Sequence, residues 1–302
     1  MASDDGWHHI PPRGRRGRQR LAEILATEAV KVQTSAGTPS TTSVLSVAEI
    51  TADHEKLCGR WRASSAYADL RAIISEHFAG HAPITTAVCL GLGSFDVKTL
   101  ADRGCRASHD AHVQLEAFQT IVKVLEQQHT GKQIKCYAQE PSFTPSDRAY
   151  LSSLGIDVLD SPAAFGLVTA RTFVFGIHLP HYAWGYALAE QLPGLYVGTD
   201  LRSLDGVNIG LAEDEVLSKV IERVGEIARG ADRWAFPVAA EWDSWLGATF
   251  AGTDILWRRR RKDDEEDHGE DGEAKEVGGH EEKREKGDTA RLENEVTGLS
   301  LG

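Results

Sequence analysis

Short apolar runs alternate with stretches of helical periodicity along the middle of this chain. The runs cover residues 86–90, 134–138, 156–159, 172–176 and 195–197. Continuous apolar runs of this length are typical of strands that are buried on both faces. Strands that are separated by helices form right-handed crossovers, which give a parallel sheet with helices on both sides. We therefore predict an α/β fold, a Rossmann-like three-layer domain with a mainly parallel sheet.

Helical patterns fill the gaps between the predicted strands. The pattern Thr144-Pro145-Ser146-Asp147 supplies an N-cap, a proline at the first helical position and a carboxylate in the first turn. We expect that helix to end at Gly155, and further helices near residues 181–191 and 216–227. Two other helical faces are predicted from apolar residues at helical spacing. They comprise Trp61, Leu70, Ile73, Ile74 and Phe78, and then Leu115, Phe118, Ile121, Val122 and Leu125.

The two ends of the chain have a different composition from its middle. Residues 1–58 begin with an arginine cluster interleaved with glycine and continue into a Ser/Thr/Pro linker, so we predict a mostly disordered basic segment. Residues 258–302 are predicted to be a charged, disordered tail. Residues 263–302 hold 15 Asp and Glu against 5 Lys and Arg, a difference of −10 out of a net charge of −12. The folded domain, predicted at residues 59–257, is therefore close to neutral, and we expect no nucleic-acid binding.

The last part of the predicted domain is rich in aromatic residues. Residues 234–257 contain Trp234, Phe236, Trp242, Trp245, Phe250 and Trp257. We expect this extension to pack on the sheet or its edge, and a partner-docking surface is the alternative.

Neither secretion nor membrane insertion is expected from the sequence. It contains no run of 18 apolar residues, and the four cysteines show no paired spacing. We expect a cytoplasmic protein with reduced cysteines, and no membrane partner. The arginines from Arg13 to Arg20 are a candidate nuclear import signal, with simple disorder as the alternative.

A glycine pair follows the first predicted strand. Gly91, Gly93 and Ser94 stand where a parallel sheet binds ligands, and glycines there let backbone N–H groups approach a phosphate or carboxylate. Asp96 occupies the position of the third glycine of the dinucleotide fingerprint, which disfavours classical NAD binding. A tight turn packed against a neighbouring helix is the alternative interpretation.

Two further candidates follow the second and fourth predicted strands. Glu140 stands where nucleotide-binding folds often hold a ribose hydroxyl, with a solvent-exposed loop as the alternative. His181, rather than His178, stands at the start of a helix, where an imidazole acts as a hydrogen-bond donor or base. Because parallel strands end at one edge, we expect Gly91, Gly93, Glu140 and His181 to converge in one cleft.

Two groups of side chains in the sequence are of the types that bind metals. Pro180 interrupts the helix that would align His178 with His181. Cys105, His109 and His112 stand in a polar stretch without an evident fourth ligand, for which a plain loop before a helix is the prediction. We expect no metal, and the sequence shows no Ser/His/Asp nucleophile elbow, so catalytic residues remain unknown.

Five separated motifs, in order, resemble the SRR-like domain family, whose name stands for sensitivity to red light reduced. They span residues 84–201 and comprise Gly91-Leu92-Gly93-Ser94-Phe95, Gln114-Leu115, Glu140-Pro141-Ser142-Phe143 with Asp147, Leu151 and Leu154-Gly155, Pro180-His181, and Gly198. The family usually has Asp at position 140, often Cys at position 182, and Gly-Asn-Ser at positions 198–200, where this chain has Glu140, Tyr182 and Gly198-Thr199-Asp200. We count Asp200 among the ligand-binding candidates.

The resemblance implies a regulatory protein, associated in some family members with circadian and light signalling and in others with haem biosynthesis. We expect a non-catalytic protein that binds a small-molecule ligand or a protein partner at the carboxyl edge of the sheet, with its cofactors unknown. The alternative is a methyltransferase-like enzyme that uses an adenosyl or nucleotide cofactor, in which Gly91 and Gly93 approach the cofactor and Glu140 holds the ribose. Phe95, in place of a small residue, counts against that alternative.

Overall fold

The computed structural model describes residues 42–96, 104–129, 131–179, 181–188, 192–201, 224–225, 229–239 and 248–259. All of them belong to the unit Met1–Arg261, one of two compact units in the chain. The arginine cluster, most of the predicted C-terminal tail and most of the helix predicted at residues 216–227 lie outside the described residues.

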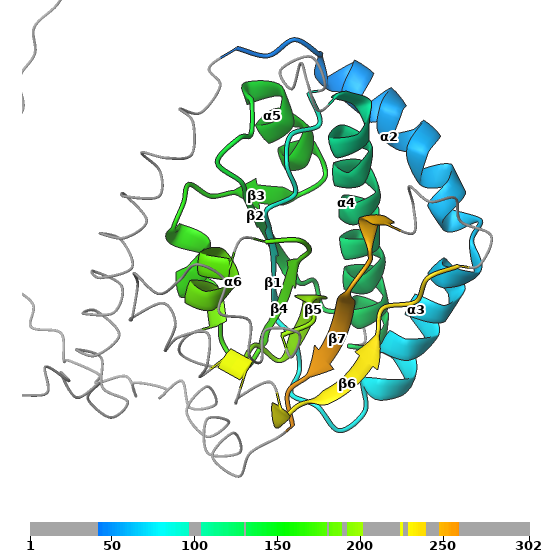
Figure 1. The fold of residues 1–302 in the computed structure, drawn as a ribbon, viewed down its shortest axis with the longest axis vertical. Coiled ribbons are helices and arrows are strands. Elements are labelled where there is room, and N and C mark those ends of the chain that lie inside the picture. The colour runs from blue at the N-terminus through cyan, green and yellow to red at the C-terminus, as the bar shows by residue number, and fades with distance from the viewer. Residues whose placement is uncertain are drawn as a thin grey trace, which may run out of the picture. The chain divides into compact units, whose positions relative to one another are not determined.

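The described residues form a seven-stranded sheet in the order β3-β2-β1-β4-β5-β7-β6 (Figure 1). Strands β1 to β5 run parallel, and β7 lies antiparallel between β5 and β6. The predicted α/β fold with a mainly parallel sheet is therefore confirmed. The strands are β1 (Thr86–Leu90), β2 (Lys135–Gln139), β3 (Ile156–Val158), β4 (Thr172–Gly176), β5 (Leu195–Thr199), β6 (Asp232–Ala235) and β7 (Thr253–Trp257).

Helices cover both faces of the sheet. On one face lie α2 (Val47–Arg62), α3 (Ser65–His77), α4 (Gly104–Gln128) and α5 (Pro145–Ser153). On the other lie α6 (His181–Leu188) and the short 3-10 helix η2 (Ala163–Leu167). None of the described helices is long and apolar enough to cross a membrane.

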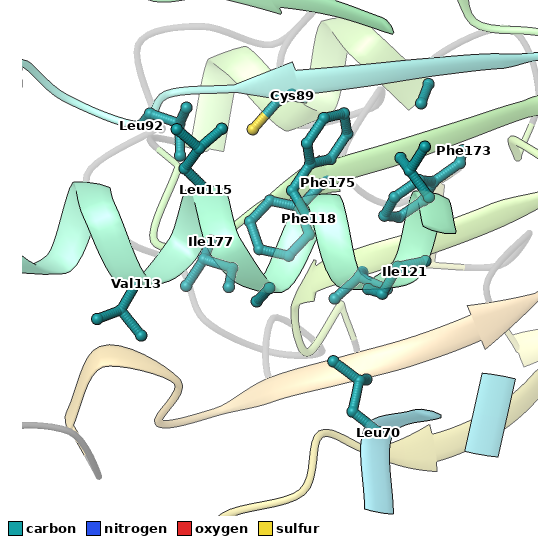
Figure 2. Packing of buried hydrophobic residues seen from close by; sticks show 14 of the residues in the cluster. Leu70, Cys89, Leu92, Val113, Leu115, Phe118, Ile121, Phe173, Phe175 and Ile177 are labelled. Atoms are coloured by element: carbon teal, nitrogen blue, oxygen red, sulfur yellow. The ribbon is translucent and has the colours of Figure 1, made fainter. Parts of the chain in front are cut away.

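Alternate residues of each central strand enter two separate cores. In β1, Ala87 and Cys89 face α3 and α4, whereas Val88 and Leu90 face η2 and α6. Figure 2 shows the first core, where Phe118 of α4 stacks on Phe173 of β4 with ring centroids 5.5 Å apart. Burial on both faces explains why the strands read as continuous apolar runs.

The N-terminal helices differ from the predicted pattern. The face predicted from Trp61 to Phe78 belongs to two helices, because Ser64 caps α3 by accepting a hydrogen bond from the Tyr67 N–H at 3.3 Å. Helix α2 begins at Val47, within the segment that the sequence assigns to the linker before residue 59. Its start is a capping box between Ser46 and Glu49. Composition alone did not show this helix, because polar residues share its buried face.

The aromatic extension supplies strands as well as packing. Trp234 lies in β6 and Trp257 in β7, and Trp257 is fully buried. Phe236 stacks on Phe250 with centroids 4.5 Å apart, and both contact Trp61 of α2. The extension therefore completes the sheet at its β6 edge, while Trp242 and Trp245 lie outside the described residues.

Candidate functional site

The chain makes a glycine turn directly after β1. Gly91 and Gly93 have φ angles of 69° and 76°, in the left-handed region that favours glycine. The Gly91 N–H donates to the carbonyl of Gln139 at 3.1 Å, which extends the pairing of β1 with β2 by one residue. The turn therefore stands at the carboxyl edge of these two strands.

Glu140, the residue after β2, faces this turn. Its Oε2 accepts a hydrogen bond from the Gly93 N–H at 3.3 Å, and its Oε1 accepts one from the Ser142 N–H at 2.9 Å. The Glu140 residue is half-buried. A backbone N–H and a carboxylate from two neighbouring strands thus meet at one place on the sheet edge.

The two glycines of the turn have different surroundings. A Cβ on Gly91 would lie 2.2 Å from Cδ2 of Leu179, whereas a Cβ on Gly93 would have no atom within 4 Å. The loop after β4 therefore covers Gly91, as expected for a packed turn, and the space beside Gly93 is open among the described residues. Of the two, Gly93 is better placed to meet a ligand.

Ser94 points into the protein. Its side chain is 1% exposed, and its hydroxyl donates to Oδ2 of Asp147 at 2.6 Å. The N–H groups of Phe95 and Thr144 also donate to Asp147, at 3.0 and 2.8 Å. Burial raises the pKa of Asp147, although these hydrogen bonds oppose the rise. Ser94 thus anchors the turn to α5, and its hydroxyl is already occupied.

The histidines after β4 lie on the same edge of the sheet. His181 is the first residue of α6, and its side chain lies outside the described residues, as does Pro180. His178 has a positive φ of 54°, and its Nε2 lies 3.3 and 3.2 Å from the carbonyl oxygens of Ala248 and Thr249. His178 therefore links the loop after β4 to the segment before β7.

Asp200 lies in an ion-pair cluster at the end of β5. Its Oδ2 accepts from the Arg233 guanidinium at 3.1 Å, and the same guanidinium binds Asp254 of β7. Burial raises the pKa of Asp254 to about 6, and the nearby Asp200 carboxylate adds to the rise against the opposing effect of Arg233. Gly93 and Glu140 are in direct contact, whereas Asp200 pairs with Arg233 at the end of β5.

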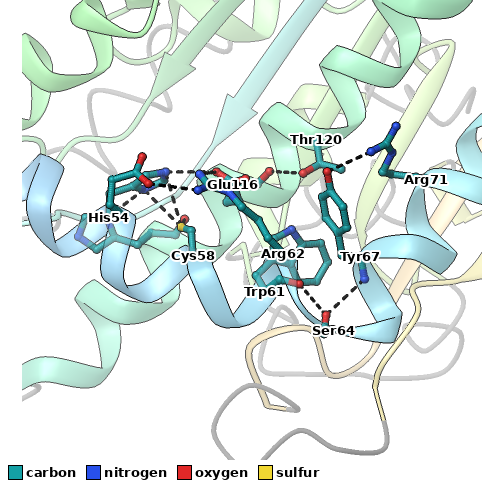
Figure 3. Close-up of polar contacts among 11 residues, drawn as sticks. His54, Cys58, Trp61, Arg62, Ser64, Tyr67, Arg71, Glu116 and Thr120 are labelled. Atoms are coloured by element: carbon teal, nitrogen blue, oxygen red, sulfur yellow. Dashed lines mark hydrogen bonds and ion pairs between the residues drawn. The ribbon is translucent and has the colours of Figure 1, made fainter.

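A buried polar cluster, which the sequence did not predict, lies between α2 and α4 (Figure 3). It consists of His54 and Cys58 on α2 and of His112 and Glu116 on α4, and Arg62 binds Glu116 from its edge. Cys105, His109 and His112 belong to α4, so the prediction of a loop there was wrong. The signal that could have revealed the cluster is the pair of i, i+4 spacings, His54 with Cys58 and His112 with Glu116.

The cluster holds its groups in definite charge states. Burial opposes ionisation of Glu116, but hydrogen bonds from His54 and Arg62 outweigh it and lower its pKa to about 2. Burial, with help from His54, lowers the pKa of His112 to about 3. Burial also raises the pKa of the Cys58 thiol far above its usual range. The cluster therefore combines an ionised carboxylate with a neutral imidazole and a protonated thiol.

A comparison with known protein families identifies the family of this chain. The sequence profile of the SRR1 domain matches residues 70–269. The chain belongs to the SRR1 domain family. The predicted resemblance is thus confirmed, and the matched range includes the Gly91–Gly93 turn and Glu140, whereas α2 precedes it.

Solved structures resemble this SRR1 domain only weakly. One is a complex that contains the Haloferax volcanii Trm112 methyltransferase activator, with 10% identity, a TM-score of 0.31, and coverage of 72% of this chain and 100% of that chain. Another is geranyl diphosphate C-methyltransferase from Streptomyces coelicolor, with 9% identity, a TM-score of 0.29, and coverage of 64% and 79%. Likeness at this level carries no argument about function. A search of curated protein sequences finds no match.

Proposed function

We propose that this SRR1 domain is a regulatory, non-catalytic protein that binds a small polar ligand beside Gly93 and Glu140. The observation that carries the proposal is the 3.3 Å contact between the Gly93 N–H and Oε2 of Glu140, beside which no described residue lies within 4 Å of a Cβ placed on Gly93. Ligands of doubly wound sheets bind outside the carboxyl ends of the strands, where this pair lies. In the other form of this proposal, the domain binds a partner protein at the same place, through polar groups of that partner.

The geometry favours a ligand with hydroxyl groups. Oε1 of Glu140 is held at 2.9 Å by Ser142, while Oε2 has a longer contact of 3.3 Å to Gly93. Oε2 is therefore the oxygen that is better placed to accept a hydrogen bond from a ligand hydroxyl. A ribose, with two adjacent hydroxyl groups, fits a carboxylate after the second strand of such a sheet.

The regulatory role rests on family membership. We propose that ligand or partner binding at this edge serves circadian or haem-biosynthesis regulation, the roles that the family resemblance implies. We place the protein in the cytoplasm, with the arginine cluster from Arg13 to Arg20 as a candidate signal for nuclear entry.

A methyltransferase-like enzyme with an adenosyl cofactor is the second candidate. The observation that favours it is the position of Phe95, which is fully buried and packs on Tyr150 and Phe143 with centroids 5.3 and 6.2 Å away. Its ring therefore lies in the core, where it does not block a cofactor at the glycine turn.

Thermal-shift measurements on the full chain test both candidates. The ligands are adenosyl cofactors, nucleotides and haem precursors, and a ligand at 100 times its Kd adds about 2.7 kcal/mol of stability. We expect one class to raise the Tm of the wild type and of Glu76→Ala, an exposed control on α3, but not of Glu140→Ala. Binding without turnover supports the regulatory form, and methyl transfer from a bound adenosyl cofactor supports the enzyme. A shift that Glu140→Ala retains in full would place the ligand elsewhere.

A further inference from the structure

Two helices present metal-binding side chains to each other in the interior of the protein. His54 and Cys58 are one helical turn apart on α2, and His112 and Glu116 are one turn apart on α4. All four residues are buried, with exposed fractions between 0 and 4%. Figure 3 shows His54 and Cys58 directed toward Glu116 across the helix interface.

The ligand atoms lie at short and similar separations. His54 Nε2 is 3.3 Å from Oε2 of Glu116, and both nitrogens of His54 are 3.6 Å from Sγ of Cys58. His54 Nδ1 is 3.3 Å from Nδ1 of His112. One ligand atom each from His54, Cys58 and Glu116 fall within 4.8 Å of one another.

The separations between the ligand atoms of His54, Cys58 and Glu116 suit a tetrahedral metal ion. With bonds of about 2.0–2.3 Å to nitrogen, oxygen and sulfur, the ligand atoms of such an ion lie about 3.3–3.7 Å apart. A single cysteine or histidine would not indicate a metal site. Here a thiol, two imidazoles and a carboxylate lie together between two helices. The set contains every ligand type that Zn²⁺ uses in proteins.

Hydrogen bonding alone leaves part of the cluster unexplained. Arg62 binds both oxygens of Glu116, at 2.7 and 3.0 Å, and His54 can donate to the same carboxylate. However, Nε2 of His112 and the hydroxyl of Tyr150 have no hydrogen-bond partner among the described residues, although both are buried. The Tyr150 ring lies 5.8 Å from that of His54, so both orphaned groups adjoin the same cluster. Such groups are costly, and the orphaned nitrogen of His112 is Nε2, whereas its Nδ1 faces His54.

We propose that His54, Cys58 and Glu116 bind a zinc ion that joins α2 to α4. A thiolate ligand favours Zn²⁺ over Mg²⁺ or Ca²⁺, which prefer oxygen ligands. The thiol of Cys58 loses its proton to solvent on binding, so that the thiolate and the Glu116 carboxylate balance the two positive charges of the ion. Arg62 then acts as a positioning residue that orients Glu116 from outside the shell.

This proposal departs from the sequence-based expectation of no metal. That expectation was based on two other groups, Cys105 and His109 with His112, and His178 with His181. Cys58 was not considered, because the sequence placed it in a linker. The three ligands are buried between α2 and α4, so the role of the ion is to hold α2 on the domain. The proposal is independent of the ligand edge at Glu140.

The test uses the purified full chain and two probes, Zn²⁺ and Co²⁺. We expect about one Zn²⁺ per chain by elemental analysis. Replacement by Co²⁺ should give the visible bands of a tetrahedral site and a thiolate-to-cobalt charge-transfer band in the near ultraviolet. Cys58→Ser should abolish the charge-transfer band and lower the metal content toward zero, whereas Cys136→Ser, at a half-buried thiol of β2, should leave both unchanged.

Folding is checked in the same samples. If Cys58→Ser unfolds, Glu116→Gln and His54→Asn provide the test, because each should weaken Co²⁺ binding at least tenfold while the far-ultraviolet circular dichroism stays that of the wild type. The proposal is overturned if the folded wild-type chain binds neither ion, or if the charge-transfer band survives in folded Cys58→Ser. A band lost equally in Cys136→Ser would also overturn it. The charge-transfer band separates this site from the exposed histidines of the chain, which supply no sulfur.

Discussion

The Ser94 hydroxyl donates a 2.6 Å hydrogen bond to Asp147, and this contact fixes the loop after β1 to the first turn of α5. Asp147 also closes the capping box with Thr144 and accepts the Phe95 N–H. One buried carboxylate therefore positions both the glycine turn and the helix that follows Glu140. The candidate ligand edge depends on a residue that does not face it.

Asp147→Ala should lower the free energy of unfolding by about 2–4 kcal/mol, because it leaves several buried donors without an acceptor. Urea unfolding followed by circular dichroism measures the loss. Asp157→Ala, at an exposed position of β3, is the matched control and should change stability by no more than about 0.5 kcal/mol. Equal effects of the two substitutions would show that Asp147 is not an anchor.

Two glycine substitutions should have opposite effects. A Cβ on Gly198 of β5 would lie 2.3 Å from the carbonyl oxygen of Gly176 on β4, so Gly198→Ala should cost about 2 kcal/mol or more. Gly59, exposed on α2, has open space, so Gly59→Ala should stabilise by about 0.5–1 kcal/mol. Thermal unfolding checks both, and a Gly198→Ala protein as stable as the wild type would refute the close packing of β4 on β5.

Asp254 should give the protein a pH-dependent stability. Its pKa in the folded protein is about 6, raised mainly by burial, whereas the usual pKa of an aspartate, 3.8, applies in the unfolded chain. The folded state thus binds more protons, so this stabilisation is complete below about pH 4 and is lost as the pH rises through 6. We expect a loss on the order of 2 kcal/mol between pH 4 and pH 7. Asp254→Asn should flatten that part of the profile in urea titrations, and parallel profiles would contradict the assignment.

Glu140→Ala and His181→Ala should each abolish the thermal shift given by a bound ligand while barely changing the Tm of the free protein. Residues of a ligand edge contribute little to the core. Isothermal titration with the ligand that shifts the wild type measures the loss of affinity. Unfolding of both variants in the absence of ligand would instead assign these residues to structure.

Limited proteolysis should remove both ends of the chain and retain the sheet. The sequence predicts a resistant core near residues 59–257, and the buried face of α2 extends the expected N-terminal limit to about Val47. Mass spectrometry of the fragments locates the cuts. A resistant fragment that continues past residue 280 would contradict the predicted tail.

The sequence predicted the parallel part of the fold because that part is local. The run 86–90 and the N-cap at Thr144 each carry their own signal, and β1 and α5 have the predicted positions. The antiparallel insertion of β7 was not predicted, because strand neighbours that are distant in sequence depend on packing. The aromatic residues of that segment were expected to pack on the sheet or its edge, with a partner-docking surface as the alternative.

The contact at the candidate ligand edge was predicted in part, and the buried cluster was not. The turn at Gly93 and the carboxylate of Glu140 meet because both follow adjacent parallel strands, which is a rule of topology. Ser94 was taken as a ligand residue, whereas its direction depends on Asp147, 53 positions away. His54 and Cys58 stand in a helix whose low hydrophobicity hid its burial, so their i, i+4 spacing was overlooked.

The place of β7 in the sheet also bears on how this chain can be synthesised and shortened. β6 has β7 as its only strand neighbour in the described sheet, and β7 is its last described strand. A nascent chain must therefore present residues up to Trp257 before β6 can join the sheet through hydrogen bonds. A translation product that stops between β6 and β7 leaves both β5 and β6 without β7 as a neighbour, and such unpaired edges are sites of aggregation. Early termination in this stretch should thus yield an insoluble protein rather than a smaller functional domain.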